Sequence, residues 1–130
     1  MKLRNLTPHK ICLYRVQDTV LGTDDNQYHP NTGARPFCVL PSEGHARAGQ
    51  GEDMVSTIDI QGTPVPVFAK TYGAPVGLPA PECGTLLIVS TLTAQAAKRA
   101  GRITEDLLVP AHPVRDKEGK IIGCAGFARI

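Results

Sequence analysis

The residues best suited to ligand chemistry lie where an apolar segment runs directly into an alanine-rich one. Ser90, Thr91 and Thr93 fall within VSTLTAQA, at the expected junction of a strand and a helix. The first amides of a helix have no acceptor inside the helix and carry partial positive charge, so three hydroxyls at this point predict a cradle for a phosphate or another anion. Ordinary capping by Ser or Thr explains the same residues, and both interpretations stay open.

Arginines in strand-like segments are a second source of anion chemistry, because a guanidinium contacts a phosphate or carboxylate through two parallel hydrogen bonds. Arg47 lies in PSEGHARA (41–48) with only Glu43 near it in sequence, which makes it the first choice for an anion contact. Arg115 is a further ligand-binding candidate, although Asp116 and Glu118 are close enough in sequence to pair with it.

The chain opens with NLTPH (5–9), which concentrates hydrogen-bonding groups before the first apolar run. Pro8 favours an extended Thr7, and the short side chains of Asn5 and Thr7 bond readily to nearby backbone, so one interpretation is a turn before the first strand. The other interpretation places Asn5, Thr7 and His9 at the rim of a cleft, where an imidazole suits a nucleobase edge or a ribose hydroxyl. His45 and His112 have the same potential.

Evidence for catalysis or metal binding is weak. The sequence contains no GxSxG, P-loop, HExxH or dinucleotide-binding fingerprint. The four cysteines lie far apart without a CxxC pair, which argues against a zinc site. A Cys38–His45 nucleophile pair has no support beyond residue identity. We therefore assign no catalytic residue, no metal and no cofactor, and the balance is against an enzyme.

Size and composition predict a single domain over 1–130. Apolar residues are 42% of the chain, but there are only three Phe, three Tyr and no Trp, so the core must be mainly aliphatic. A net charge of +2 is too small for a protein that tracks a nucleic-acid backbone. The sequence shows no secretory signal and no apolar run near the ~20 residues of a membrane span, so we expect a cytoplasmic protein with reduced cysteines.

Eleven prolines and thirteen glycines divide the chain into short segments. We predict strands at 9–16, 37–40, 45–48, 85–90 and 107–109, a hairpin over 56–70 that turns at Gln61-Gly62, and a second hairpin that turns at 116–119. Residues 19–21 extend a hairpin before a polar loop. Pro64 and Pro66 place their strand at a sheet edge or bulge.

One helix is predicted from about 92 to 100, with Lys98 and Arg99 in its last turn and Gly101 as its stop. The proline- and glycine-rich segment 71–84 is expected to be an ordered loop that presents a surface, and Tyr72 in it is a ligand-binding candidate. The predicted fold is α+β, a mostly antiparallel curled sheet or small barrel of short strands with one main helix.

Four segments together resemble a known family: NLTPH at 5–9, PSEGHARA at 41–48, YGAPVGLPAPECGTLLIVS at 72–90 and DLLVPAHPVRDKEGKIIGCAGFAR at 106–129. The chain is similar to small uncharacterised proteins of phages, prophages and actinomycetes, and the resemblance covers most of it apart from 22–35. Family members carry a PGT type of ending where this chain has Pro81-Glu82-Cys83, which affects the turn of that loop. The resemblance implies a phage or mobile-DNA context and no particular activity.

Small phage proteins without enzyme motifs often act by binding, an argument from analogy. The main hypothesis is an anti-defence sponge that sequesters a nucleotide-derived immune signal in the host cytoplasm, with a small nucleotide-like ligand and neither membrane nor nucleic-acid polymer as partner. The hypothesis allows for a homo-oligomer, because small subunits often build pockets at symmetric interfaces. One alternative is a virion-accessory or host-protein-binding module, and a second is a small hydrolase or transferase that uses His9 or a cysteine.

Overall fold

The computed structural model describes residues 1–130, except that the side chain of Tyr72 lies outside the described part. It contains ten strands, one α-helix and one short 3-10 helix, η1 (Val16–Asp18). The helix is α1 (Thr91–Arg99), and the strands are β1 (Lys2–Asn5), β2 (Ile11–Leu13), β3 (Thr19–Leu21), β4 (Tyr28–Pro30), β5 (Cys38–Leu40), β6 (Arg47–Ile60), β7 (Thr63–Val76), β8 (Thr85–Ile88), β9 (Leu107–Arg115) and β10 (Ile121–Ala128).

Eight strands form one strongly curled sheet in the order β1-β8-β9-β10-β2-β5, with β4 beside β9 and β3 beside β4. The predicted α+β class, with one main helix on a nearly closed sheet, is confirmed. Most registered residue pairs are antiparallel, yet β1–β8, β8–β9, β2–β10 and β4–β9 pair in parallel among the strands described. These parallel pairs join segments that are distant in sequence.

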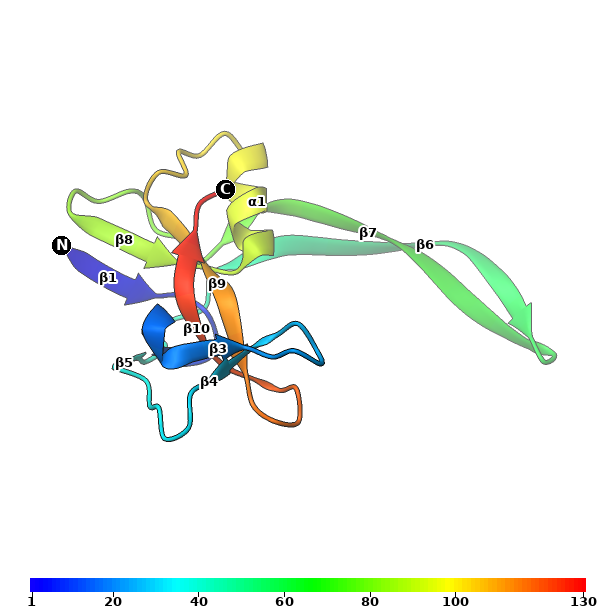
Figure 1. The fold of residues 1–130 in the computed structure, drawn as a ribbon. Coiled ribbons are helices and arrows are strands. Elements are labelled where there is room, and N and C mark those ends of the chain that lie inside the picture. Colours follow the sequence, from blue (N-terminus) through cyan, green and yellow to red (C-terminus); the bar gives the residue numbers. More distant parts are fainter.

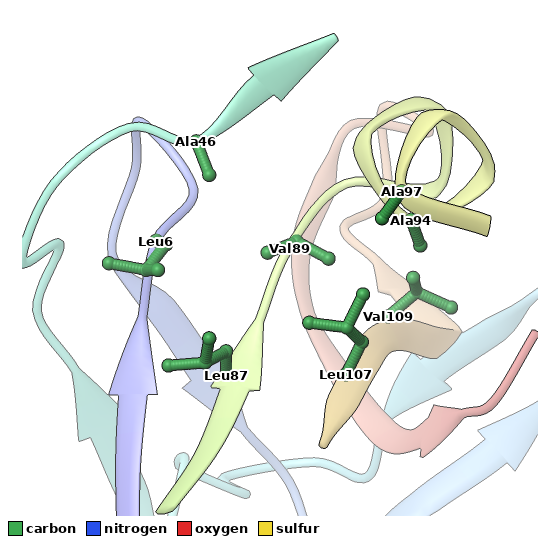
Figure 2. Packing of buried hydrophobic residues seen from close by; sticks show 8 residues of the cluster. All are labelled: Leu6, Ala46, Leu87, Val89, Ala94, Ala97, Leu107 and Val109. Carbon is green, nitrogen blue, oxygen red and sulfur yellow. The ribbon is translucent and has the colours of Figure 1, made fainter. Parts of the chain in front are cut away.

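The core is aliphatic, as the composition predicts. One cluster lies where α1 covers the sheet (Figure 2), and its buried residues are Leu6, Ala46, Leu87, Val89, Ala94, Ala97, Leu107 and Val109. Alanine on the buried face of α1 lets the helix backbone approach the sheet closely. A second cluster packs inside the curled sheet around Ile11, Leu13, Ile88 and Cys124. This packing therefore fixes the position of α1 beside the carboxyl end of β8.

Strands β6 and β7 form a separate two-stranded sheet that projects far from the rest of the molecule (Figure 1). The predicted turn is confirmed, since Gln61 and Gly62 have φ values of 52° and 80°, as a tight hairpin turn with two left-handed residues requires. The hairpin is longer than predicted, at 14 residues a strand. We call residues 50–73 of this hairpin the arm.

Several local expectations need correction. The segment 71–84 is a loop only from 77, because 71–76 continues β7. Strand β9 extends to Arg115 rather than ending at 109, through two prolines. Strand β1 was not predicted, and β4 lies inside a segment interpreted as a polar loop. The helix spans Thr91–Arg99, one residue earlier than predicted. In the described part of the chain, no helix has both the length and the apolar character to cross a bilayer.

Candidate functional site

A cavity of about 540 Å³ lies between the start of α1 and the base of the β6–β7 hairpin. Two parts of the chain that are more than forty residues apart in sequence meet there. Its lining residues are His45, Arg47, Ala48, Gly49, Gln50, Val76, Ser90, Leu92 and Thr93. The structure thus brings three of the candidate residues, Arg47, Ser90 and Thr93, to one place.

A hydrogen bond between α1 and the hairpin base fixes the relative position of these residues. The hydroxyl of the fully buried Thr93 donates to the carbonyl oxygen of Ala46 over 3.1 Å, and Ala46 directly precedes β6. Ala46 in turn donates its amide to the carbonyl of Leu6. Arg47, the first residue of β6, is therefore held beside the first turn of the helix by the core of the protein.

Ser90 is the N-cap of α1. Its hydroxyl oxygen accepts the amide of Thr93 at 3.3 Å and lies 2.9 Å from the Thr93 hydroxyl. The amide and hydroxyl of Thr93 are thus bonded to other protein groups, so Thr93 shapes the wall of the cavity rather than offering a hydrogen bond to a ligand. Among the described residues, the amides of Thr91 and Leu92 have no protein acceptor. Leu92 lines the cavity and the predicted site residue Thr91 does not, so the Leu92 amide is the N–H group left for a ligand there.

The cavity is electropositive in character. Arg47 is exposed at its rim, and among the described residues no carboxylate lies within 4 Å of it. Glu43, its only acidic neighbour in sequence, faces the amide of Asn5 at 3.4 Å instead. None of the described lining residues is acidic. An unpaired guanidinium and the start of a helix therefore act on the same space.

The base of the hairpin needs a glycine to form one wall of this cavity. A Cβ atom at Gly49 would lie 2.7 Å from the carbonyl oxygen of Ala74, so no larger residue fits without a shift of backbone. The β6–β7 register is irregular between Ala48 and Gly49. This irregularity follows the pairing of Arg47 with Val76, which brings an apolar residue opposite the arginine.

Sequence reasoning missed five of the lining residues: Ala48, Gly49, Gln50, Val76 and Leu92. Gln50 and Val76 reach the cavity only through the long hairpin, and the sequence pattern 45–48 gave no sign that β6 continues to residue 60. Leu92 was interpreted only as part of the helix. The expected register of a longer hairpin is the signal that would have found Gln50 and Val76.

Asn5 and Thr7 lie away from this cavity and bond to the chain itself. Asn5 is 1% exposed, and its Nδ2 donates to the carbonyls of His9 at 2.8 Å and Leu40 at 3.0 Å. Its Oδ1 accepts the amide and the hydroxyl of Thr7, at 3.0 Å and 2.6 Å. Because Asn5 ends β1 and Leu40 ends β5, this side chain joins the two ends of the curled sheet. The turn interpretation of NLTPH describes this geometry.

His9 is exposed and lines a second, more apolar groove of about 1020 Å³, together with residues of β2, β9 and β10. Arg115 lines neither cavity: its Nε donates to Gln27 Oε1 at 3.1 Å and its Nη1 to the carbonyl of Gly119 at 2.8 Å. The structure therefore places these two candidates apart from the Arg47 site. Tyr72 was also predicted to contact a ligand, but its side chain lies outside the described residues.

An Asp–His pair sits on the surface beside β4. His29 Nε2 lies 2.7 Å from Asp25 Oδ2, and His29 Nδ1 lies 2.9 Å from the carbonyl oxygen of Arg115. Both ring nitrogens face acceptors, so the protonated ring fits best. The hydrogen bond to Asp25 raises the pKa of His29. The pKa of Asp25 is lowered, mainly by the hydrogen bond from the Gln27 amide and next by the hydrogen bond from His29. The pair fastens the 22–30 segment to β9.

The buried cysteine, Cys124, lies in surroundings that favour its protonated thiol. All four cysteines are free, and Cys124 is buried, which raises the pKa of its thiol and favours the unreactive protonated form. Among the described residues there is no group of three or more His, Cys, Asp or Glu side chains placed to hold a metal ion. The Arg47 cavity is therefore the place where several of the predicted ligand-binding residues meet.

Comparison with known proteins adds no relatives: no protein-family model matches the chain, and neither the curated proteins nor the solved structures contain a significant match.

Proposed function

We propose that this protein binds a small anionic ligand, a nucleotide-derived signal molecule, in the cavity between α1 and the hairpin base, and sequesters it without turnover. The observation that supports this most is the meeting of an unpaired Arg47 with the free amide of Leu92, in the first turn of α1, around one cavity that no described acidic side chain lines. The phage context implied by the sequence resemblance suggests an anti-defence sponge.

A phosphate suits this position for two independent reasons. The amides at the start of a helix donate to phosphate oxygens, and the helix dipole adds about 0.3–1 kcal/mol for a negative charge placed there. A guanidinium contacts phosphate through paired hydrogen bonds, and Arg47 has no carboxylate partner in the described chain to compete for it. The phosphate of the ligand would lie between the two.

The rest of the cavity favours a ligand larger than inorganic phosphate. Its volume of about 540 Å³ falls within the range of small-molecule sites, roughly 300–1,000 Å³. Val76, Leu92 and Ala48 offer apolar surface for a base or sugar, and Gln50 and His45 offer hydrogen-bonding groups for its edges. This mixture is typical of nucleotide sites rather than of simple ion sites.

The direct test is a thermal-shift and calorimetry panel that includes ADP-ribose, cyclic dinucleotides and inorganic phosphate. A ligand at 100 times its Kd stabilises the protein by about 2.7 kcal/mol, which raises Tm by several degrees. We expect at least one nucleotide to do so and phosphate alone to do so weakly. An unchanged Tm with every nucleotide at high excess would end the proposal.

Variants locate the binding site. Arg47→Gln should weaken nucleotide binding by about tenfold or more, since loss of a charged hydrogen-bonding pair costs about 1.5–3 kcal/mol. The matched control is Arg35→Gln, because Arg35 is also exposed but lines neither cavity. Mass analysis of the ligand after incubation separates capture from turnover: a changed mass would favour the hydrolase or transferase alternative.

The second candidate function is an interaction module that binds a host or virion protein. The exposed hairpin favours it, because proteins seldom project an apolar arm without a partner. Affinity purification should then return one stoichiometric partner with the wild-type chain and lose that partner with Ile58→Asp at the arm. Retention of the same partner by Ile58→Asp would exclude the arm as the contact.

A further inference from the structure

In the described part of the chain, the arm packs mainly on itself. Within the structure, β6 and β7 pair with each other and pack otherwise on α1, which touches only the base of the hairpin (Figure 1). A two-stranded ribbon alone is marginally stable in water, because one face of side chains has nothing to pack against. A strand of 14 residues spans about 45 Å, so most of this ribbon is unsupported.

The outer part of the arm has one apolar face. Cross-strand pairs place Ile58 opposite Val65 and Ser56 opposite Val67, and Ile60 lies two residues beyond Ile58 on the same side. Ile58 and Ile60 are 51% and 49% exposed. A bulge between Met54 and Ser56 separates this face from the base of the hairpin. An exposed strip of β-branched residues at the end of an arm is typical of a contact surface.

The arm is also acidic. Between residues 50 and 71 it carries Glu52, Asp53, Asp59 and a single cation, Lys70. Lys70 Nζ lies 3.9 Å from Glu52 Oε1. This pairing leaves the negative charges of Asp53 and Asp59 without a described partner. The fitting partner therefore offers an apolar surface with positive charge at its edge.

The body of the same chain presents such a surface. The groove of about 1020 Å³ has a mainly apolar lining that includes Ile11, Ile121 and Ile122. Its charged lining residues are two exposed lysines, Lys10 and Lys120, and none of its described lining residues is acidic. Ile121 is 54% exposed although it belongs to the sheet.

We infer that the arm of one copy docks its apolar face into the Lys10–Lys120 groove of a second copy, with Asp53, which the register places on the same face as Val67, beside those lysines. The contact joins different surfaces on the two copies, so it is heterologous and propagates into a closed ring or an open filament. The length of the arm allows this. The remaining ~100 residues form a body roughly 35 Å across, and the arm, whose strands run over 50–60 and 63–73, is about 36 Å long, so it reaches a neighbouring body.

The first test is the mass of the wild-type protein, measured by light scattering and sedimentation velocity over a wide range of protein concentrations. We expect assembly beyond a monomer that weakens with added salt, because the lysine–aspartate contacts at the rim are screened. Ile58→Asp in the arm and Lys120→Glu in the groove should each prevent assembly. Arg35→Glu, with the same charge reversal outside both surfaces, should assemble as wild type does.

Mixing the two defective variants identifies the geometry. Ile58→Asp retains a working groove and Lys120→Glu retains a working arm, so an equimolar mixture should form a one-to-one dimer and nothing larger. If two arms packed against each other instead, Lys120→Glu would assemble normally and the mixture would gain nothing. Either of those results, or a wild-type protein that stays monomeric at every concentration, would overturn the inference. The groove variant leaves the arm sequence unchanged, so its result stands even if Ile58→Asp unfolds the arm.

Discussion

The side chain of Asn5 joins the two ends of the curled sheet, and its replacement by Ala tests how much this junction contributes to stability. The substitution removes four hydrogen bonds at once. The Thr7 hydroxyl keeps a second bond, to the carbonyl of His9 at 3.0 Å, and His9 is exposed, so water can replace part of the loss there. The Thr7 amide and the Leu40 carbonyl lose their only side-chain partner.

The expected cost follows from those two groups. A partly buried polar group left without a partner costs about 1–3 kcal/mol, so Asn5→Ala should lower the free energy of unfolding by about 2–4 kcal/mol. Asn5→Asp should be at least as harmful at neutral pH, because a carboxylate cannot donate to the carbonyls of His9 and Leu40. Thr7→Ser keeps the hydroxyl and should change stability little.

Urea unfolding, followed by circular dichroism, measures these differences. The matched control is Asn31→Ala, since the exposed Asn31 makes one side-chain bond, from Nδ2 to the carbonyl of Gln17 at 3.0 Å. That change should cost no more than about 1 kcal/mol. If Asn5→Ala were no more harmful than Asn31→Ala, the junction between β1 and β5 would not depend on this side chain and our account of the opening motif would be wrong.

Three further predictions concern other parts of the molecule. Asp25 raises the pKa of His29 above its usual 6.5, so the stabilisation from their contact should be full below pH 6.5 and lost as pH rises through the raised pKa. NMR titration of the ring gives the pKa, and unfolding at several pH values gives the change in stability. His29→Gln should remove this pH dependence. Thr93→Val should cost about 1–3 kcal/mol by leaving the Ala46 carbonyl unpaired, with Thr93→Ser as a milder comparison in the same unfolding assay. Gly123→Ala places a Cβ atom 2.5 Å from a carbonyl oxygen of β2 and should cost about 1–3 kcal/mol, whereas Gly126→Ala, with open space around it, should be tolerated.

Local chemistry explains which elements could be predicted from the sequence. The Gln61-Gly62 turn, the turn before Gly119 and the helix stop at Gly101 each require a left-handed residue, and each was placed correctly. The apolar run before the helix was correctly interpreted as a buried strand. These features depend on a few adjacent residues, so a single sequence is enough to reveal them.

What failed depends on distant partners. The strand predicted at 107–109 continues through Pro110 and Pro113 to Arg115, because β9 pairs with β8 and β4 only near its two ends and one edge is free where the prolines lie. The hairpin was predicted only over 56–70, whereas its inner part extends to the pairing of Arg47 with Val76, a register that no local pattern in the sequence reveals. The candidate site shares this limit: Arg47 and Ser90 were singled out, but their meeting depends on how the hairpin base packs on α1.

The parallel pairing of β1 with β8 has a consequence for how the chain folds. Lys2 to Asn5 align with Thr85 to Ile88, so these partners are separated by 83 positions of chain that include the whole hairpin. A contact of such long range must first overcome the entropy of closing that loop, which predicts slow folding among proteins of this size. During synthesis the first strand has to wait, unpaired, until most of the polypeptide has left the ribosome.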